Sequence, residues 1–356
     1  MTGIDFGFVA TAVGPAGTPD VPMYRELIGD CEYCVDLGFS TAWLIEHHFS
    51  DYFPTPDPLG LLQFIAGRVP ELNLGTCVIV TPWHNPLRLV EQIAQLNALT
   101  DRALHLGLGR GTAKFEYDAF GIRMDETRAR FAEILDIIRL GLTGRPFTYA
   151  GAHYQVPKEI LVRPVTDAAK IHFYGAIGNP ASAPLMAQMG LPPMCTTVGD
   201  YEQQRKTLVD WETAARAAGQ PTGGKRPIMI NCIVADTDQE AIAQAQQYIP
   251  AFMKAQVDHY TIDETPWEDI KGYEAWRRIF SGMKARMDPA NIPPWTEWQL
   301  VGSPDTVRRR LQNYIDVGFN SILLHTATPG VPAAARREWT RRFAVDVMPD
   351  FRSVAV

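Results

Sequence analysis

Short apolar runs rich in β-forming residues alternate with longer amphipathic segments, and this alternation limits the possible folds more than any other feature of the sequence. Eight runs are predicted to form strands: Ile4–Thr11, Thr41–Ile45, Asn73–Val80, Ala103–Leu108, Ile171–Gly175, Pro193–Thr197, Ile228–Ala235 and Ser321–His325. Helical periodicity lies between most of them: Tyr24–Leu37, Pro86–Leu99, Thr127–Leu142, Ala181–Met189, Tyr201–Ala218, Gln239–Phe252 and Pro304–Val317. Eight strands that alternate with helices predict an α/β protein with a (β/α)8 TIM barrel.

A doubly wound parallel sheet is the alternative fold for such an alternation. That fold would be expected to carry a glycine fingerprint after its first strand. The segment Val13-Gly14-Pro15-Ala16-Gly17 occupies this place, but its proline breaks the fingerprint. The barrel is therefore favoured, as a single domain over residues 1–356.

Two insertions interrupt the alternation. Residues Phe147–Val156 alternate around Ala150-Gly151-Ala152 and predict a small hairpin beside the barrel. The segment Asp258–Gln299 follows the seventh strand, contains four tryptophans and lacks a regular pattern. Because a loop of this length is usually functional, we expect a mobile lid or insertion here.

Composition and charge exclude several classes of partner. The net charge is -7, there is no basic run, and no apolar stretch approaches ~20 residues, so neither nucleic acid nor a membrane is expected as a partner. The first residues lack a signal-peptide pattern, and five cysteines without framework spacing suit a reducing cytoplasm. Cys31 and Cys34 have the spacing of a redox or zinc pair, but they share one face of a predicted helix, so we expect them in the core.

The tetrad Glu46-His47-His48-Phe49 directly follows the apolar run Thr41–Ile45. Polar residues at the carboxyl end of a buried parallel strand face the end of the fold where chemistry is usually placed. Histidine is also the side chain whose ordinary pKa lies within the physiological range. The tetrad alone is equally compatible with two histidines satisfied in the core and with a catalytic site.

Together with its neighbours, the tetrad resembles the bacterial luciferase family of flavin-dependent monooxygenases. The matching blocks run in the same order along nearly the whole chain: Trp43-Leu44-Ile45-Glu46-His47-His48-Phe49, Leu72-Asn73-Leu74-Gly75-Thr76-Cys77-Val78-Ile79-Val80-Thr81-Pro82, Asn85-Pro86-Leu87-Arg88, Leu106-Gly107-Leu108-Gly109-Arg110-Gly111, Phe120-Gly121, Gly190-Leu191-Pro192, Val301-Gly302-Ser303-Pro304 and Val347-Met348-Pro349. Each block is weak alone, and the ordered set is specific.

The resemblance implies a barrel that is usually homodimeric and takes reduced FMN from a separate flavin reductase. The family forms a flavin hydroperoxide with O2 and inserts one oxygen atom into a small hydrophobic substrate. Family members that use a deazaflavin commonly lack the paired histidines, so FMN is favoured here. Gly109 stands where luciferase has its reactive cysteine, which argues against light emission.

The resemblance also assigns the catalytic residues. His47 occupies the place of the family's catalytic histidine and would move a proton, while His48 and Glu46 would hold its orientation and tautomer. His84 stands one residue before the place of a further luciferase histidine, which is Asn85 here. Its side chain either projects into the site or simply lies on the loop, and we favour the loop.

The cofactor contacts that the resemblance implies lie on one strand and after two others. Arg110 would hold the FMN phosphate through charge-assisted bonds. Gly178, Asn179 and Ser182 would form the second half of the phosphate site, at the start of a helix. Thr76, Cys77 and Val78 would lie under the flavin ring, with a cis peptide between Cys77 and Val78.

Three other functions compete with this interpretation. The first is a deazaflavin-dependent oxidoreductase of the same family. The second is a non-catalytic flavin-binding partner subunit, which in luciferase lacks the histidine pair. The third is a metal-dependent hydrolase that uses His105, His172 and His325 from predicted strands. Because no His-x-His motif follows the first strand, we expect no metal site.

Overall fold

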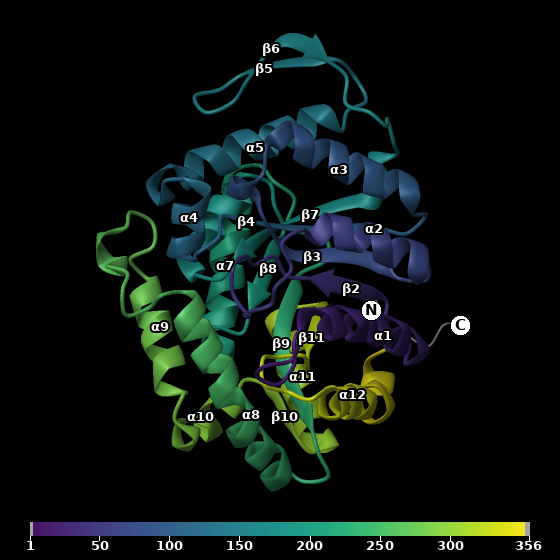
Figure 1. Ribbon diagram of the computed structural model, residues 1–356, viewed down its shortest axis with the longest axis vertical. Helices are drawn as coiled ribbons and strands as arrows, with labels where there is room; N and C mark the ends of the chain where they lie inside the picture. Colours follow the sequence, from purple (N-terminus) through teal and green to yellow (C-terminus); the bar gives the residue numbers. More distant parts are fainter. Residues whose placement is uncertain (1–2, 353–356) are drawn as a thin grey trace.

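Eight parallel strands close into a barrel in the computed structural model, which describes residues 3–352 (Figure 1). The barrel strands are β1 Asp5–Ala10, β2 Thr41–Leu44, β3 Asn73–Val80, β4 Leu104–Gly109, β7 Ile171–Ile177, β8 Pro193–Thr196, β9 Pro227–Val234 and β11 Ser321–His325. They pair in this order, and β11 pairs with β1 to complete the ring. This closure confirms the predicted barrel and excludes a doubly wound sheet.

Helices surround the barrel on its outside (Figure 1). They are α1 Asp20–Asp36, α2 Pro58–Arg68, α3 Pro86–Leu99, α4 Lys114–Phe120, α5 Thr127–Gly141, α6 Ala183–Gln188, α7 Tyr201–Ala217, α8 Asp238–His259, α9 Trp276–Ala285, α10 Ile292–Thr296, α11 Pro304–Val317 and α12 Ala333–Arg342. The sequence did not predict α2, α4 or α12. Helix α2 has a clear start, because the Asp57 side chain accepts a hydrogen bond from the Gly60 amide and Pro58 follows the cap.

The barrel interior is apolar and tightly filled. Apart from Asp5, the barrel strands contain no Asp, Glu, Lys or Arg. The Trp43 indole lies between two glycines on the neighbouring strands, and a Cβ atom at Gly7 or Gly75 would come within 2.3 or 2.5 Å of that indole. Glycine at these two positions therefore makes room for the tryptophan. Cys31 and Cys34 are buried free thiols on α1, as predicted.

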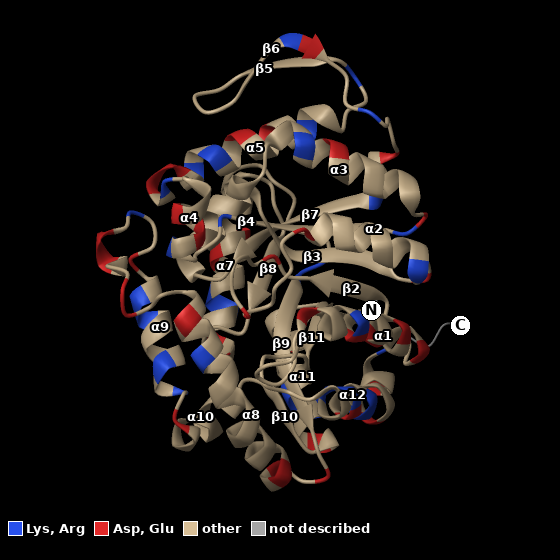
Figure 2. Cartoon of the chain, in the orientation of Figure 1, with Lys and Arg blue, Asp and Glu red and all other residues tan. Residues whose placement is uncertain are grey.

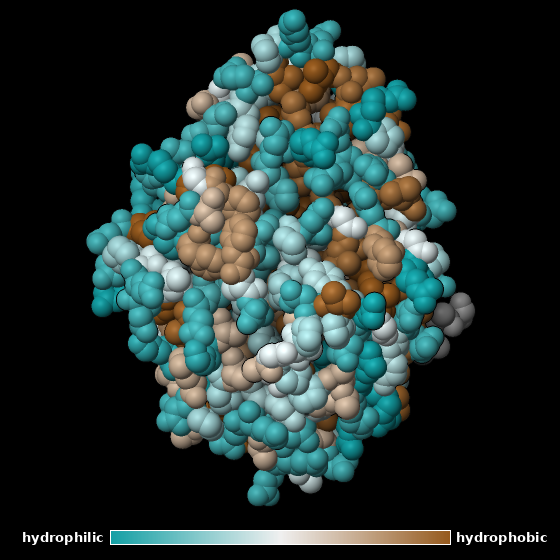
Figure 3. Space-filling view, viewed as in Figure 1, coloured by the Kyte–Doolittle hydropathy of each residue, from teal (hydrophilic) through white to brown (hydrophobic). Residues whose placement is uncertain are grey.

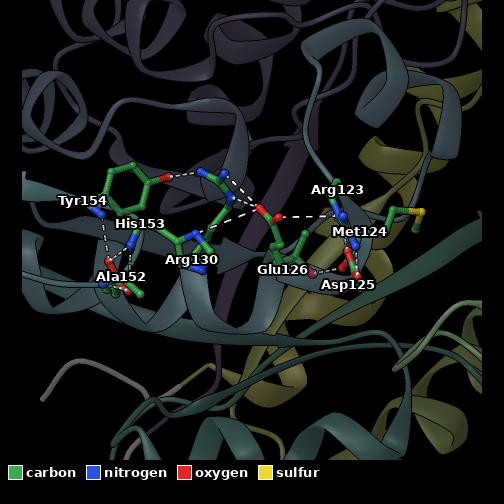
Figure 4. A network of polar contacts seen from close by, with 10 residues as sticks. Arg123, Met124, Asp125, Glu126, Arg130, Ala152, His153 and Tyr154 are labelled. Atoms are coloured by element: carbon green, nitrogen blue, oxygen red, sulfur yellow. Dashed lines mark hydrogen bonds and ion pairs between the residues drawn. The ribbon is translucent and has the colours of Figure 1, made fainter.

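The hairpin that was predicted from Phe147 forms beside α5. Its strands are β5 Phe147–Ala150 and β6 Gln155–Ile160, and its second strand is longer than expected. The Glu133 carboxylate on α5 accepts hydrogen bonds from the backbone amides of its turn at Ala152, His153 and Tyr154. Figure 4 shows the adjoining network, in which Glu126 lies between Arg123 and Arg130. These contacts tie the hairpin to the body of the molecule.

The predicted loop Asp258–Gln299 is instead largely helical. It begins inside α8, forms α9 and α10, and is followed by the short strand β10 Leu300–Gly302, which pairs with β9. Its aromatic side chains Trp267, Tyr273 and Phe280 are buried in one cluster with Tyr117 of α4. Trp267 and Trp276 therefore belong to a packed cover beside the barrel, whereas Trp295 and Trp298 pack in a separate cluster. The spacing that looked irregular reflects short helices joined by tight turns.

Charged residues lie mainly on the outer helices (Figure 2). The face in Figure 3 is largely hydrophilic, with apolar residues gathered beneath the hairpin and near the middle. None of the helices described within residues 3–352 is both long enough and apolar enough to span a membrane.

Candidate active site

The tetrad follows β2 at the carboxyl end of the barrel, as predicted, and its Glu46 is the centre of a buried polar network. Glu46 Oε1 lies 3.1 Å from His48 Nε2 and 2.9 Å from His84 Nε2, and Oε2 accepts a hydrogen bond of 2.7 Å from the Val80 amide. Burial acts to raise the pKa of Glu46, but the two imidazoles and the amide outweigh it, so this pKa lies below its ordinary value.

His84 is therefore part of the site: its backbone lies on the loop before α3, but its side chain projects into the site, which was the less favoured of the two alternatives. Burial opposes protonation of His84, but the Glu46 carboxylate raises the pKa of the imidazole above its ordinary value. The backbone explains the placement, because a short 3₁₀ turn at Thr81–Trp83 directs residue 84 back toward β2. The buried Glu46 carboxylate and the half-buried His84 imidazole thus form a pair.

His47 faces away from this network. Its Nδ1 lies 3.6 Å from Glu116 Oε1, and its ring centroid lies 4.4 Å from that of His259. Glu46 hydrogen-bonds His48 and His84 rather than His47, so the expectation that Glu46 and His48 orient His47 does not hold. Burial lowers the pKa of His47 to about 3, which keeps the imidazole neutral at physiological pH.

Glu116 and His259 are site residues that the sequence did not reveal. Glu116 lies on α4, is buried, and accepts a hydrogen bond of 2.8 Å from the His48 amide. His259 is the last residue of α8, and its Nε2 lies 3.5 Å from Glu116 Oε1 while its Nδ1 lies 2.7 Å from Ser50 Oγ. Burial raises the pKa of Glu116 and lowers that of His259 to about 2.

Aromatic rings enclose this histidine pair. The Tyr52 ring lies 4.8 Å from both His47 and His259, measured between centroids, and Phe53 and Tyr260 lie further out around His47. Tyr52 is buried and accepts a hydrogen bond of 3.0 Å from Gln256. The wall shields most of the surface of both imidazoles from water, and this burial is the main cause of their low pKa values.

Arg110 follows β4 at the same end of the barrel. Its guanidinium carbon lies 5.1 Å from the centre of the Tyr273 ring, and its Nη1 is buried without a hydrogen-bond partner among the described residues. The next residue, Gly111, has a φ of +78°, which favours glycine. A buried guanidinium nitrogen without a partner fits an anionic group such as a phosphate.

The second predicted half of the phosphate site differs in detail from expectation. Strand β7 continues to Ile177, so the expected loop starts two residues later, at Gly178. The Asn179 side chain accepts a hydrogen bond from the Ala181 amide, so its oxygen caps a 3₁₀ turn, and Ser182 ends that turn. A Cβ atom at Gly178 would lie 3.0 Å from Trp276, so α9 covers this loop.

The expected contacts on β3 divide into two kinds. The Cys77–Val78 peptide is cis, which confirms the prediction, and both side chains are half-buried. Thr76 is fully buried and its hydroxyl donates to the Gly107 carbonyl at 3.1 Å, so its side chain lies inside the barrel wall and only its backbone could approach a cofactor.

Helix α4 connects the two ends of the candidate site. Glu116 contacts His47, while the hydroxyl of its neighbour Tyr117 donates to the Arg110 carbonyl and lies 2.9 Å from the Tyr273 hydroxyl. The imidazole after β2 and the guanidinium after β4 therefore lie at one mouth of the barrel. The strand histidines lie elsewhere: His105 stacks on His172 and lies 3.0 Å from the Tyr174 hydroxyl. Within residues 3–352, neither belongs to a group of three possible metal ligands.

Residues 4–321 match the family model of luciferase-like monooxygenases, and the chain belongs to this family. It is 26% identical over 279 residues to 4-hydroxyprotoasukamycin monooxygenase of Streptomyces nodosus subsp. asukaensis, covering 75% of this chain and 73% of that protein. It is also 42% identical over 120 residues to the uncharacterized protein y4vJ of Sinorhizobium fredii, covering 34% of each chain. The uncharacterized protein y4wF of the same organism is 33% identical over 142 residues, which cover 40% of this chain and 42% of that protein.

Solved structures share the fold over the whole chain. The monooxygenase RslO1 from Streptomyces bottropensis is 26% identical with a TM-score of 0.78, covering 98% of this chain and 100% of that chain. The oxygenating constituent of 3,6-diketocamphane monooxygenase of Pseudomonas putida, in complex with FMN, is 17% identical with a TM-score of 0.76 and 98% coverage of both chains. An F420-dependent secondary alcohol dehydrogenase is 14% identical with a TM-score of 0.75, covering 99% of this chain and 100% of that chain.

Proposed function

We propose that this protein is a flavin-dependent monooxygenase that uses reduced FMN and O2 to insert one oxygen atom into a small hydrophobic organic substrate. The observation that carries the proposal is the pairing, at one mouth of the barrel, of a buried guanidinium nitrogen without a partner at Arg110 and a neutral imidazole at His47. The Arg110 guanidinium fits the phosphate of a flavin nucleotide, and the His47 imidazole fits proton transfer next to the flavin ring.

The residues of the chain would divide the work as follows. Arg110 would bind the phosphate through charge-assisted hydrogen bonds, and Gly178 would allow backbone to approach it. Reduced FMN, when bound, would supply the electrons that activate O2. His47 would accept a proton at Nε2, the ring nitrogen that does not face Glu116.

The segment that contains Tyr273 and α9 covers the candidate flavin site and would exclude water from it. Tyr273 packs on Arg110 and Trp276 packs on Gly178, so the segment that follows α8 touches both predicted parts of the phosphate site. Oxygen activation on a flavin benefits from a dry site, because water competes in side reactions. The aromatic residues around His47 suit an apolar substrate in the same way.

A deazaflavin-dependent oxidoreductase is the second candidate, because an F420-dependent enzyme shares the fold. We favour FMN because the similar structure of the 3,6-diketocamphane monooxygenase constituent contains FMN. The paired histidines His47 and His48 also resemble those of FMN-dependent family members. A non-catalytic partner subunit is less consistent with the polar network around both histidines. A separate flavin reductase, a homodimer and a cytoplasmic location remain proposals that follow from the family.

An anaerobic titration followed by exposure to air tests the proposal. We expect reduced FMN to bind more tightly than reduced F420, and a pulse of O2 to give a flavin absorbance change that a hydrophobic substrate accelerates. The His47→Ala variant should bind FMN and lose coupled turnover, while His172→Ala, an exposed histidine on β7, serves as the matched control. Preferential binding of F420, or undiminished coupled turnover in His47→Ala, would overturn the proposal.

A further inference from the structure

Three potential metal ligands from separate parts of the fold converge beside the predicted flavin site. They are His47 after β2, Glu116 on α4 and His259 at the end of α8, and one ligand atom of each lies within 4.8 Å of the other two. Two imidazoles and a carboxylate form a ligand set that proteins use for zinc and for non-haem iron. The histidines on the barrel strands, which we considered for metal binding from the sequence, play no part in it.

The distances match those between the ligands of a bound ion. Glu116 Oε1 lies 3.6 Å from His47 Nδ1 and 3.5 Å from His259 Nε2, which is too long for a hydrogen bond. For ligand bonds of about 2.1 Å, the edges of a tetrahedral site are roughly 3.4 Å. Two of the three distances between ligand atoms therefore already match a tetrahedral site, and the third, between the imidazoles, lies within 4.8 Å and would shorten when an ion binds.

Both imidazole nitrogens also lack any other partner. His47 Nδ1 and His259 Nε2 are buried, and neither has a hydrogen-bond partner within residues 3–352. The His259 side chain is 0% exposed and the Glu116 side chain 1%. Buried polar atoms without partners are uncommon, and a pair of them directed at one carboxylate oxygen points to a bound species.

Hydrogen bonds from neighbouring residues orient two of the three proposed ligands, His259 and Glu116. The Ser50 hydroxyl, 2.7 Å from His259 Nδ1, can accept a hydrogen bond from a protonated Nδ1, and this tautomer leaves the lone pair on Nε2. The His48 amide donates to Glu116 Oε1 and orients the carboxylate. A hydrogen bond to the far nitrogen of an imidazole ligand, such as that of Ser50 to His259, sets the tautomer of the ring and raises its affinity for the ion.

We propose that His47, Glu116 and His259 form a binding site for one divalent transition-metal ion of the zinc type, with a water molecule as a further ligand. An ion on Nδ1 of His47 requires that the proton of the neutral ring sits on Nε2. That nitrogen then donates a proton instead of accepting one. If the proposed function holds, the ion is therefore an inhibitor, and the site regulates oxygenation.

Metal binding is measured on the flavin-free protein after treatment with a chelator. We expect Co²⁺ to bind one per chain with a visible absorption band, and Zn²⁺ to displace it. Glu116→Gln and His259→Gln, which keep similar shapes, should weaken Co²⁺ binding at least 100-fold. Ser50→Ala should weaken it by about 10–100-fold, as expected for the loss of a partner behind a ligand. His172→Ala should leave the affinity unchanged.

Thermal melts identify any variant that fails to fold, and Ser50→Ala, whose hydroxyl is not a ligand, keeps the test informative in that case. Absence of a band in the wild type, or an unchanged band in Glu116→Gln, His259→Gln and Ser50→Ala, would overturn the metal site. Inhibition of flavin-dependent turnover by Zn²⁺ is measured separately. Failure of flavin binding would sink the proposed function and leave the Co²⁺ result standing.

Discussion

Replacement of Arg110 tests the phosphate site most directly. The guanidinium has one buried nitrogen without a partner, so the structure predicts at least one charge-assisted hydrogen bond to a bound anion. Such a bond is worth about 1.5–3 kcal/mol, which corresponds to roughly 10- to 150-fold in affinity. We therefore expect Arg110→Ala to bind reduced FMN about 10- to 150-fold more weakly, and more weakly still if a second nitrogen of the fork contributes.

Riboflavin, which has the same ring without a phosphate, separates this effect from a general loss of structure. Anaerobic fluorescence titrations should show that Arg110→Ala binds riboflavin as the wild type does. Arg110→Lys should be intermediate, because lysine keeps the charge and loses the planar fork. Removing the guanidinium also removes its contact with Tyr273, so thermal melts accompany each titration. Equal weakening of FMN and riboflavin, or no weakening of either, would refute the assignment of Arg110 to the phosphate.

Three further predictions concern stability and the cover. Gly75→Ala should lower the free energy of unfolding by about 1–3 kcal/mol in urea, because its Cβ would lie 2.5 Å from an indole carbon, whereas Gly67→Ala on α2, where nothing lies within 4 Å, should cost nothing. Burial lowers the pKa of His105 to about 3, so the unfolded chain binds the proton at a higher pH than the folded one. The free energy of unfolding should therefore fall below pH 6.5, by about 2 kcal/mol at pH 5. His105→Asn should remove this contribution to its pH dependence. Gly178→Val should displace Trp276 and speed hydrogen exchange in α9, and unchanged exchange there would contradict the packing of the cover on this loop.

The barrel could be predicted from the sequence because its signals are local. Each strand is a short apolar run, and most helices between them show their own periodicity and end at a glycine or begin at a cap. Helix α2 was missed because apolar residues and two glycines obscure its periodicity. Helix α4 has only seven residues, which is too short for a periodic pattern to be visible.

The candidate site was only partly predictable. His47 and Arg110 stand directly after strands, where a local pattern marks them. Glu116 and His259 lie 68 and 209 residues from their contacts at His48 and Ser50, and each looks like an ordinary polar residue of a helix. Only the three-dimensional packing of α4 and α8 over the barrel mouth brings them to the imidazole of His47.

The pairing of β1 with β11 has a consequence for biosynthesis. Asp5 stands beside Ser321 in the closed ring, so β1 finds its second neighbour only after more than three hundred further residues have been made. Until then the nascent sheet keeps an exposed, apolar edge that could pair with other chains. We expect newly made protein to depend on chaperones for as long as this seam stays open.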